Sequence, residues 1–290
     1  MVLPKKILLA TDLSARCDRA FDRAVRLARQ WNSHLTIATA IEGPTDDLDY
    51  TRIDLSIDEG IRAVVQEVLD EAARAQIVAE VIVRRGQAAD VLTGILQERS
   101  FDLVVTGLAR RTGFLRTVLG GTVERLLKKA TAPVLMVKMR AWGDYHTALA
   151  GLDFSPGSRA ALECAHHLFP ELRPIVLHTF RAGYKGIASG PLEYRSMLRA
   201  AREDCEKFIA AVVPEWSELL CIPQVGDPVD ELTHQAQRTK AELMVVGSND
   251  RGTLAEFLLG STGRDLISHA PCDLLMVPFD WQRLPTTPLA

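Results

Sequence analysis

The strongest constraint on the fold is an internal repeat that spans nearly the whole chain. At an offset of 140 residues Gly107 corresponds to Gly247, and near the start of each copy an offset of 141 matches Asp12 with Asp153. A shift of one residue over such a length indicates duplication, and a repeat of this size is a domain and not a turn of a solenoid. The 290 residues therefore predict two domains of the same fold.

Each copy alternates short apolar runs with segments whose apolar residues recur at helical spacing. In the first half the expected strands are residues 5–10, 35–40, 79–83, 103–106 and 133–137, and the expected helices are 20–31, 61–75, 88–97 and 122–130. This alternation implies parallel pairing with right-handed crossovers, and hence a Rossmann-like, doubly wound open sheet covered by helices on both faces. Such α/β sheets bind ligands beyond the carboxyl ends of the strands, at the switch point.

The pattern breaks between Met139 and Tyr145 and then begins again. We predict one domain at residues 1–140, a linker at 141–145, a second domain at 146–280 and a C-terminal tail at 281–290. In the second half, strands are expected at 147–152 and 175–180. Ser155-Pro156 has the residue types of a helix N-cap followed by the first helical position. After the second strand of each copy the halves differ, because residues 42–58 are acidic whereas 181–191 are basic and glycine-rich. Both segments are expected to be surface loops.

Composition excludes several functional classes. The net charge of −3 gives no global basic field of the kind that nucleic acids or anionic membranes attract. No apolar run resembles a signal peptide or a spanning helix, so we expect a cytoplasmic protein without a membrane partner. The five cysteines are scattered without a CxxC pair and the histidines are dispersed, which predicts reduced, mostly buried thiols and no metal site.

Two corresponding passages, residues 101–122 and 241–261, run from an apolar strand through glycines into a helix. Glycine lets the backbone approach a ligand closely, and the N–H groups at a helix N-terminus favour phosphate. The alternative is structural, with the glycines permitting turns and helix caps while Asp12 and Asp153 end strands. Neither a Walker A pattern nor a G-x-G-x-x-G follows any expected strand, which disfavours P-loop and dinucleotide-binding proteins.

The strand-end aspartates, the repeated domains and the late G-x2-x-x9-G pattern resemble the universal stress protein family in its tandem two-domain form. The resemblance covers nearly the whole chain. It implies a five-stranded parallel sheet in the order 3-2-1-4-5 in each domain, and ATP, with magnesium, as a possible ligand. It also implies that Asp12 and Asp153 contact the nucleoside, and that two chains form a homodimer.

In the second half, the resemblance assigns the phosphate loop to Gly247, Gly260 and Ser261. Asp250 stands where ATP-binding members of the family have a second glycine. Two like charges about 4 Å apart cost about 4 kcal/mol at an effective dielectric of about 20. A carboxylate facing a triphosphate is therefore unfavourable unless a cation or Arg251 compensates.

In the first half, the corresponding loop would use Gly107 and Gly120. Arg110 replaces the middle glycine, and Thr122 carries its hydroxyl one place late because Gly121 takes the position of the family's serine or threonine. The charge of an arginine suits phosphate, yet its side chain occupies space that glycine leaves open. The nearby Arg111 and Arg116 fit a phosphate or partner patch, or a solvated surface.

Three functions remain open on the sequence. The first is a stress-response regulator or sensor that binds ATP or a related nucleotide at one or both sites. The second is a non-nucleotide module with degenerate loops that binds a protein or another small molecule. The third is a slow ATPase or phosphotransferase, for which no general base stands out beyond Asp12 and Asp153. No catalytic residue is predicted, and the protein partners are unknown.

Overall fold

The computed structural model describes residues 3–13, 18–41, 59–108, 121–180, 191–248 and 261–281. The chain divides into two compact units, which meet in sequence between Asp144 and Tyr145. We call Leu3–Asp144 the first domain and the residues from Tyr145 onward the second domain. No described helix is long and apolar enough to cross a membrane.

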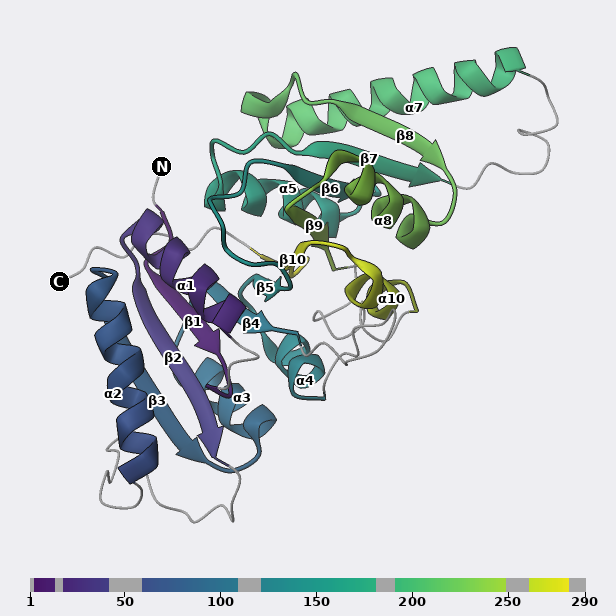
Figure 1. The fold of residues 1–290 in the computed structure, drawn as a ribbon. Coiled ribbons are helices and arrows are strands. Elements are labelled where there is room, and N and C mark those ends of the chain that lie inside the picture. The colour runs from purple at the N-terminus through teal and green to yellow at the C-terminus, as the bar shows by residue number, and fades with distance from the viewer. Residues whose placement is uncertain are drawn as a thin grey trace. The chain divides into compact units, whose positions relative to one another are not determined.

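The first domain is a parallel sheet with helices on both faces (Figure 1). Its strands are β1 (Lys6–Ala10), β2 (His34–Ile41), β3 (Ala79–Arg85), β4 (Leu103–Gly107) and β5 (Val134–Val137). Its described helices are α1 (Asp18–Trp31), α2 (Glu59–Arg74), α3 (Ala88–Glu98) and α4 (Gly121–Lys129). The strands lie in the order β3-β2-β1-β4-β5. Right-handed crossovers in this order put α1 and α2 on one face and α3 and α4 on the other.

The second domain repeats this arrangement. Its strands are β6 (Ala148–Leu152), β7 (Ile175–Phe180), β8 (Cys221–Val225), β9 (Leu243–Gly247) and β10 (Asp273–Val277). Its described helices are α5 (Pro156–Leu168), α7 (Pro191–Val212), the short 3-10 helix η1 (Pro214–Trp216), α8 (Pro228–Thr239) and α10 (Ser261–His269). The order β8-β7-β6-β9-β10 is again 3-2-1-4-5. The predicted fold class and strand order are therefore confirmed in both domains.

The central strands are buried on both faces, which explains their uninterrupted apolar sequences. Ile7, Leu8 and Leu9 of β1 are fully buried, as is Leu149 of β6. The predicted helix start at Ser155 is also confirmed, because Ser155 Oγ accepts a hydrogen bond from Ser158 N at 3.1 Å.

The described cysteines, Cys164, Cys205, Cys221 and Cys272, are free and buried as predicted. The helix α7 was not predicted, and its first residue, Pro191, was wrongly assigned to a loop. Proline suits that place because the first turn of a helix needs no N–H donor.

A carboxylate fastens the first strand of each domain at its amino end. In the first domain Asp102 Oδ2 accepts hydrogen bonds from the backbone N–H groups of Lys5 and Lys6, at 2.7 and 2.9 Å. In the second domain Glu242, the corresponding residue, accepts from His146 N and Thr147 N at 2.7 and 3.1 Å. The two domains therefore share the same hydrogen-bonding arrangement, with an aspartate in the first and a glutamate in the second.

The pKa of Glu242 lies below its usual value. Partial burial raises this pKa, but the hydrogen bonds from the backbone N–H groups of His146 and Thr147 together more than offset that increase. A lowered pKa in the folded state means that the carboxylate stabilises the fold above the unfolded-state pKa of about 4.3, and that this stabilisation is lost as the pH falls through the folded-state pKa.

Replacing Glu242 with glutamine is expected to lower the free energy of unfolding by up to about 1 kcal/mol at neutral pH, a small value because the side chain is largely solvated. The difference from the natural protein should shrink to zero in acid, where both side chains are neutral. Urea titrations at several pH values measure this. Glu218→Gln, at an exposed residue, is the control and should stay within about 0.5 kcal/mol at every pH; a Glu242→Gln deficit that persists undiminished in acid would contradict the account.

Candidate functional site

Four of the predicted site residues, Asp12, Gly107, Asp153 and Gly247, lie at or just after the carboxyl ends of neighbouring strands. Ala10 of β1 is in register with Thr106 of β4, so Asp12 and Gly107 follow at the same edge of the first sheet. β6 and β9 are likewise parallel neighbours, so Asp153 and Gly247 lie at the corresponding edge of the second sheet. Each pair flanks the switch point of its sheet, where doubly wound folds bind ligands.

Asp153 closes the turn between β6 and α5. Its Oδ1 atom accepts hydrogen bonds from Ser155 N at 3.0 Å and from Ser155 Oγ at 2.5 Å. The side chain is nonetheless exposed. An ionised carboxylate has about four acceptor sites on its two oxygens, so Asp153 can accept further hydrogen bonds from a ligand.

The residue after each strand-end aspartate has a left-handed backbone conformation. Leu13 has φ 54° and Phe154 has φ 63°. This region costs a non-glycine residue roughly 1–2 kcal/mol. Because both domains keep the same strained position although the side chains differ, the turn geometry itself is retained, and such strain concentrates at functional sites.

A close contact between backbone segments fixes the start of α5 against the end of β9. A Cβ atom on Gly157 would lie 1.8 Å from Ser248 O, and one on Gly247 would lie 1.9 Å from Gly157 O. No side chain of any size fits at either position without moving the backbone. The two glycines therefore set the distance between the first turn of α5 and the strand-end edge of the sheet.

The helices after the glycine-containing passages begin at the same place in the repeat. α4 starts at Gly121 and α10 starts at Ser261, 140 residues later. Each helix follows β4 or β9 and runs back along the sheet, so its free N–H groups lie toward the carboxyl ends of the strands. Thr122 is half-buried in the first turn of α4, and a Cβ atom on Gly121 would have no neighbour within 4 Å.

Aromatic side chains gather beside Asp153, which the sequence reasoning missed. The Phe154 ring lies 4.6 Å from the His178 ring and 5.5 Å from the Phe208 ring, between centroids. His178 also stacks on Phe180 at 5.6 Å. The available signal was the i, i+2 spacing of His178 and Phe180, which puts both on one face at the end of β7.

The first domain lacks this aromatic group. By the register of the strands, Thr39 and Ile41 take the places of His178 and Phe180. Thr39 is buried and Ile41 is half-buried. Leu13 corresponds to Phe154, whose side chain is 37% exposed. The two strand-end sites therefore differ in the surface beside the aspartate. At these matched positions the second domain has an exposed aromatic ring and the first domain has none.

Several predicted site residues lie outside the described part of the chain. They are Arg110, Arg111, Arg116, Gly120, Asp250, Arg251 and Gly260, together with the segments 42–58 and 181–190. The side chain of Ser261 lies outside it as well. What the replacements at Arg110 and Asp250 do to a ligand stays a prediction.

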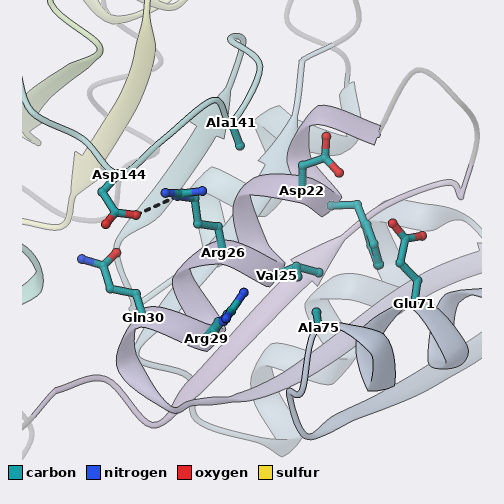
Figure 2. A pocket seen from close by; sticks show the side chains of 10 residues that line it. Asp22, Val25, Arg26, Arg29, Gln30, Glu71, Ala75, Ala141 and Asp144 are labelled. Atoms are coloured by element: carbon teal, nitrogen blue, oxygen red, sulfur yellow. Dashed lines mark hydrogen bonds and ion pairs between the residues drawn. The ribbon is translucent and has the colours of Figure 1, made fainter.

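A cavity of about 550 Å³ lies elsewhere in the first domain, between α1, α2 and the segment after β5 (Figure 2). Phe21 and Val25 give it an apolar wall, Glu71 comes from α2, and an ion pair of 2.7 Å joins Arg26 to Asp144 at its rim. Burial and, secondarily, the charge of Asp18 raise the pKa of Asp22 on this wall, against a smaller opposing effect of Arg140. The cavity shares no residue with the strand-end site.

The segment after β5 is held by arginines on one face of α1. Arg19 Nη1 donates to Lys138 O and Arg23 Nη1 donates to Gly143 O, both at 2.8 Å. These contacts fasten part of the predicted linker to the first domain. Among the described residues, no group of histidine, cysteine, aspartate and glutamate side chains could hold a metal ion.

Comparison with known proteins gives a consistent result. The model of the universal stress protein family matches residues 4–138 and, separately, residues 144–278. A universal stress protein of Mycobacterium tuberculosis is 26% identical over 280 residues, which are 89% of this chain and 94% of that protein. The universal stress protein YxiE of Bacillus subtilis is 26% identical over 147 residues, 46% of this chain and 98% of its own. One relative thus matches both domains and the other matches a single domain.

A solved structure agrees at the level of the fold. The crystal structure of a universal stress protein from Archaeoglobus fulgidus superposes with a TM-score of 0.67, covering 94% of this chain and 98% of that chain at 18% identity. At this identity the likeness extends to the fold alone.

Proposed function

This chain belongs to the universal stress protein family and is a stress-response protein, and from that premise we propose that it is a regulator or sensor that binds ATP or a related nucleotide at its strand-end sites. The second domain is the favoured site. The proposal includes magnesium as the counter-ion of the phosphates. The predicted cytoplasmic location and homodimeric state are also proposals, and neither depends on nucleotide binding.

The observation that carries the proposal is the strained turn after the strand-end aspartate. The left-handed residues Leu13 and Phe154 hold Asp12 and Asp153 at the switch points of the two sheets, and both carboxylates are exposed. A turn that needed only to end a strand would have no reason to retain this costly backbone conformation in both copies. A ligand that contacts the aspartate is a reason.

The chemistry of the edge suits the two ends of a nucleotide. A carboxylate accepts hydrogen bonds and donates none, so Asp153 fits ribose hydroxyls or an amino group of the base. The N-terminus of α10 at Ser261 fits phosphate, because helix N–H groups and the helix dipole favour an anion. The exposed ring of Phe154 adds a surface on which a base can stack, which favours the second domain.

Calorimetric titration of the full chain with ATP and magnesium tests the proposal, and thermal unfolding gives an independent readout. ATP at about 100 times its dissociation constant should add roughly 2.7 kcal/mol to the stability of the domain that binds it. Asp153→Asn keeps an acceptor for the turn but removes the charge, and it should weaken binding at least tenfold, about 1.4 kcal/mol. Asp12→Asn tests the first domain in the same way.

Asp204→Asn is the matched control, since this exposed carboxylate of α7 lies outside the strand-end site and, among the described residues, forms a surface ion pair with Lys207. Its titration should match that of the natural protein. Titrations with GTP, AMP and inorganic phosphate separate recognition of the base from recognition of the phosphates. A natural protein that shows neither heat nor a thermal shift at millimolar ATP would refute nucleotide binding and leave the second, non-nucleotide function.

A further inference from the structure

The outer edge of strand β3 carries backbone groups that no described residue binds. β3 is the end strand of the first sheet, and β2 is its neighbour on the inner side. Its hydrogen bonds with β2 begin at Val78 O and end at Gly86 N, so the even-numbered residues face β2. The N–H and C=O groups that point outward belong to Ala79, Val81, Val83 and Arg85.

The matching edge of the second domain is blocked. β8 begins its hydrogen bonds with β7 at Leu220 O and ends them at Gly226 N, so Pro223 points outward. Pro223 has no N–H to offer, and at the repeat offset of 140 residues it corresponds to Val83, which also points outward. Proline on an outward position is a common protection of edge strands against pairing. Within the described part of the chain, the repeat thus has one edge strand protected by proline and one, β3, without such protection; we call the latter the open edge.

The open edge is complementary to itself in the antiparallel direction. With a twofold axis at Ile82, each outward residue of one copy faces an outward residue of the other, and Val81 is opposite Val83 of the second copy. The same register brings Glu80 opposite Arg84 of the second copy. Opposite charges across two strands stabilise a sheet, whereas like charges destabilise it. A twofold axis at Val81 instead would put Glu80 opposite Ile82 and lose this match.

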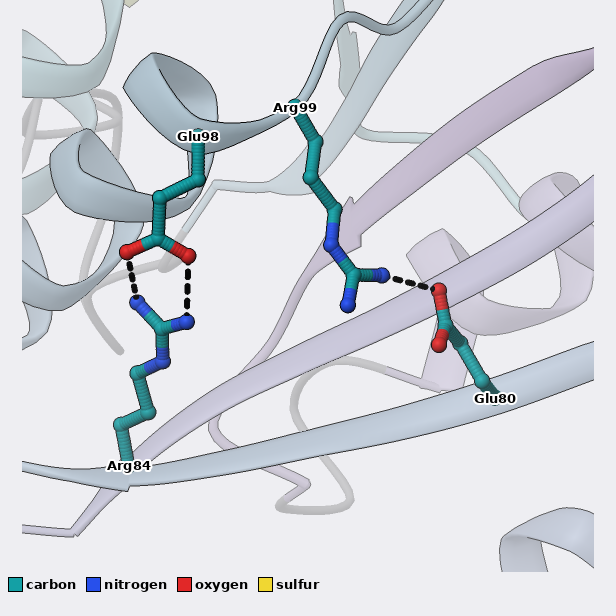
Figure 3. Close-up of polar contacts among 4 residues, drawn as sticks. All are labelled: Glu80, Arg84, Glu98 and Arg99. Atoms are coloured by element: carbon teal, nitrogen blue, oxygen red, sulfur yellow. Dashed lines mark hydrogen bonds and ion pairs between the residues drawn. The ribbon is translucent and has the colours of Figure 1, made fainter. Parts of the chain in front are cut away.

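Ion pairs inside the domain hold Glu80 and Arg84 along the face that α3 covers (Figure 3). Arg84 binds Glu98 through two hydrogen bonds of 2.7 and 2.5 Å, which lower the pKa of that carboxyl. Glu80 accepts hydrogen bonds from Arg99 at 2.6 Å and from Thr36 Oγ1 at 2.8 Å. The charges are thus arranged before any partner arrives, which lowers the entropic cost of association.

We propose that two copies of this chain associate through their β3 strands, antiparallel and with the twofold axis at Ile82, so that the two first-domain sheets become continuous. The inference is independent of nucleotide binding, because β3 and the residues that fix its charges do not include the strand-end aspartates. It names the surface of the homodimer, which the sequence left open.

The backbone test puts a proline at an outward position of β3, as the repeat does in β8. Val81→Pro removes an outward N–H without touching the hydrogen bonds to β2, just as Pro223 does in β8. Light scattering and sedimentation of the full chain should give the mass of two chains for the natural protein and of one chain for Val81→Pro. Val81→Thr keeps the N–H and the β-branched shape, so this control should remain dimeric.

A crosslinking test reads the register and does not depend on tolerance of proline. On the axis, the two copies of residue 82 would have Cα atoms about 4.5 Å apart, within the range of roughly 4.4–6.8 Å that a disulfide spans. Ile82→Cys should therefore form a covalent dimer on mild oxidation, visible on a non-reducing gel. Gln224→Cys on β8 is the control and should not, because that edge is protected.

The proposal is overturned if the natural protein has the mass of one chain at several hundred micromolar, or if Val81→Pro is folded and still dimeric. Failure of Ile82→Cys to crosslink overturns the register even if a dimer exists. Loss of ATP binding in the aspartate variants would leave all these results unchanged, so the two proposals fail separately.

Discussion

Gly157→Ala is expected to destabilise the second domain by about 3 kcal/mol, the upper part of the range for overpacking a closely packed site. The added methyl group would lie 1.8 Å from Ser248 O and 2.9 Å from the carbonyl carbon of the same residue. The obstacle is backbone, which cannot turn away as the end of a flexible side chain does. The start of α5 or the segment after β9 must therefore move, and Ser248 is fully buried.

Hydrogen exchange read by mass spectrometry, together with urea titration, measures this effect. Exchange should rise in β9 and in the first turn of α5 and stay unchanged in the first domain, because the disturbance is local. Gly121→Ala is the matched control. Its methyl group meets open space in the first turn of α4, so it should be neutral or stabilising by up to about 1 kcal/mol. Equal losses in both variants would mean that the contact between Gly157 and Ser248 is not the cause.

Gly247→Ala tests the same contact from the side of β9. Its Cβ atom would lie 1.9 Å from Gly157 O. Because both substitutions force apart the same two segments, their effects should not add in the double variant. The contact also determines where the N-terminus of α5 lies relative to Asp153. The single variants should therefore weaken any ligand of the second-domain site more than one of the first-domain site.

The fold was predictable where the information is local. Alternating apolar runs identify strands and helices along the chain, and parallel pairing follows from their alternation. Because the domain is duplicated, each helix or strand can be predicted independently from two sequence segments. The duplication does not help where the copies differ, and α7 is such a case. Among the residues of this 22-residue helix whose burial the structure describes, Cys205 and Ile209 alone are buried, so its amphipathic signal is weak.

The candidate site was predictable in part for the same reason. Asp12 and Asp153 follow the first strands of their domains, and topology alone carries both to the switch point. The contact between Gly157 and Gly247 joins residues 90 positions apart, and its closeness depends on the depth at which α5 packs. In the first half the position that matches Gly157 holds Arg16, so the repeat gives no hint of the contact. The aromatic rings around Phe154 also come together only through packing between elements.

Trp216→Ala is expected to destabilise the second domain by about 3–5 kcal/mol, the usual cost of emptying the site of a buried large aromatic side chain. Trp216 is 1% exposed and ends the short helix η1, which the sequence did not predict. Its ring packs edge-on against His166 of α5, with 5.1 Å between centroids and an angle of 76°. This one side chain therefore ties the connection between α7 and β8 to α5.

Trp216→Phe separates packing from hydrogen bonding. Trp216 Nε1 is buried and has no hydrogen-bond partner among the described residues, so removing the N–H relieves a desolvation cost of about 1–3 kcal/mol while the smaller ring leaves a cavity. The two effects oppose each other, and the phenylalanine variant should stay within about 1–2 kcal/mol of the natural protein.

Far-UV circular dichroism during urea titration measures all variants without relying on tryptophan fluorescence. Trp142→Ala, at a side chain that is 82% exposed, should change stability by less than about 0.5 kcal/mol. If alanine and phenylalanine at position 216 cost the same, the indole N–H must have a partner, and the stabilisation would be polar and not one of packing.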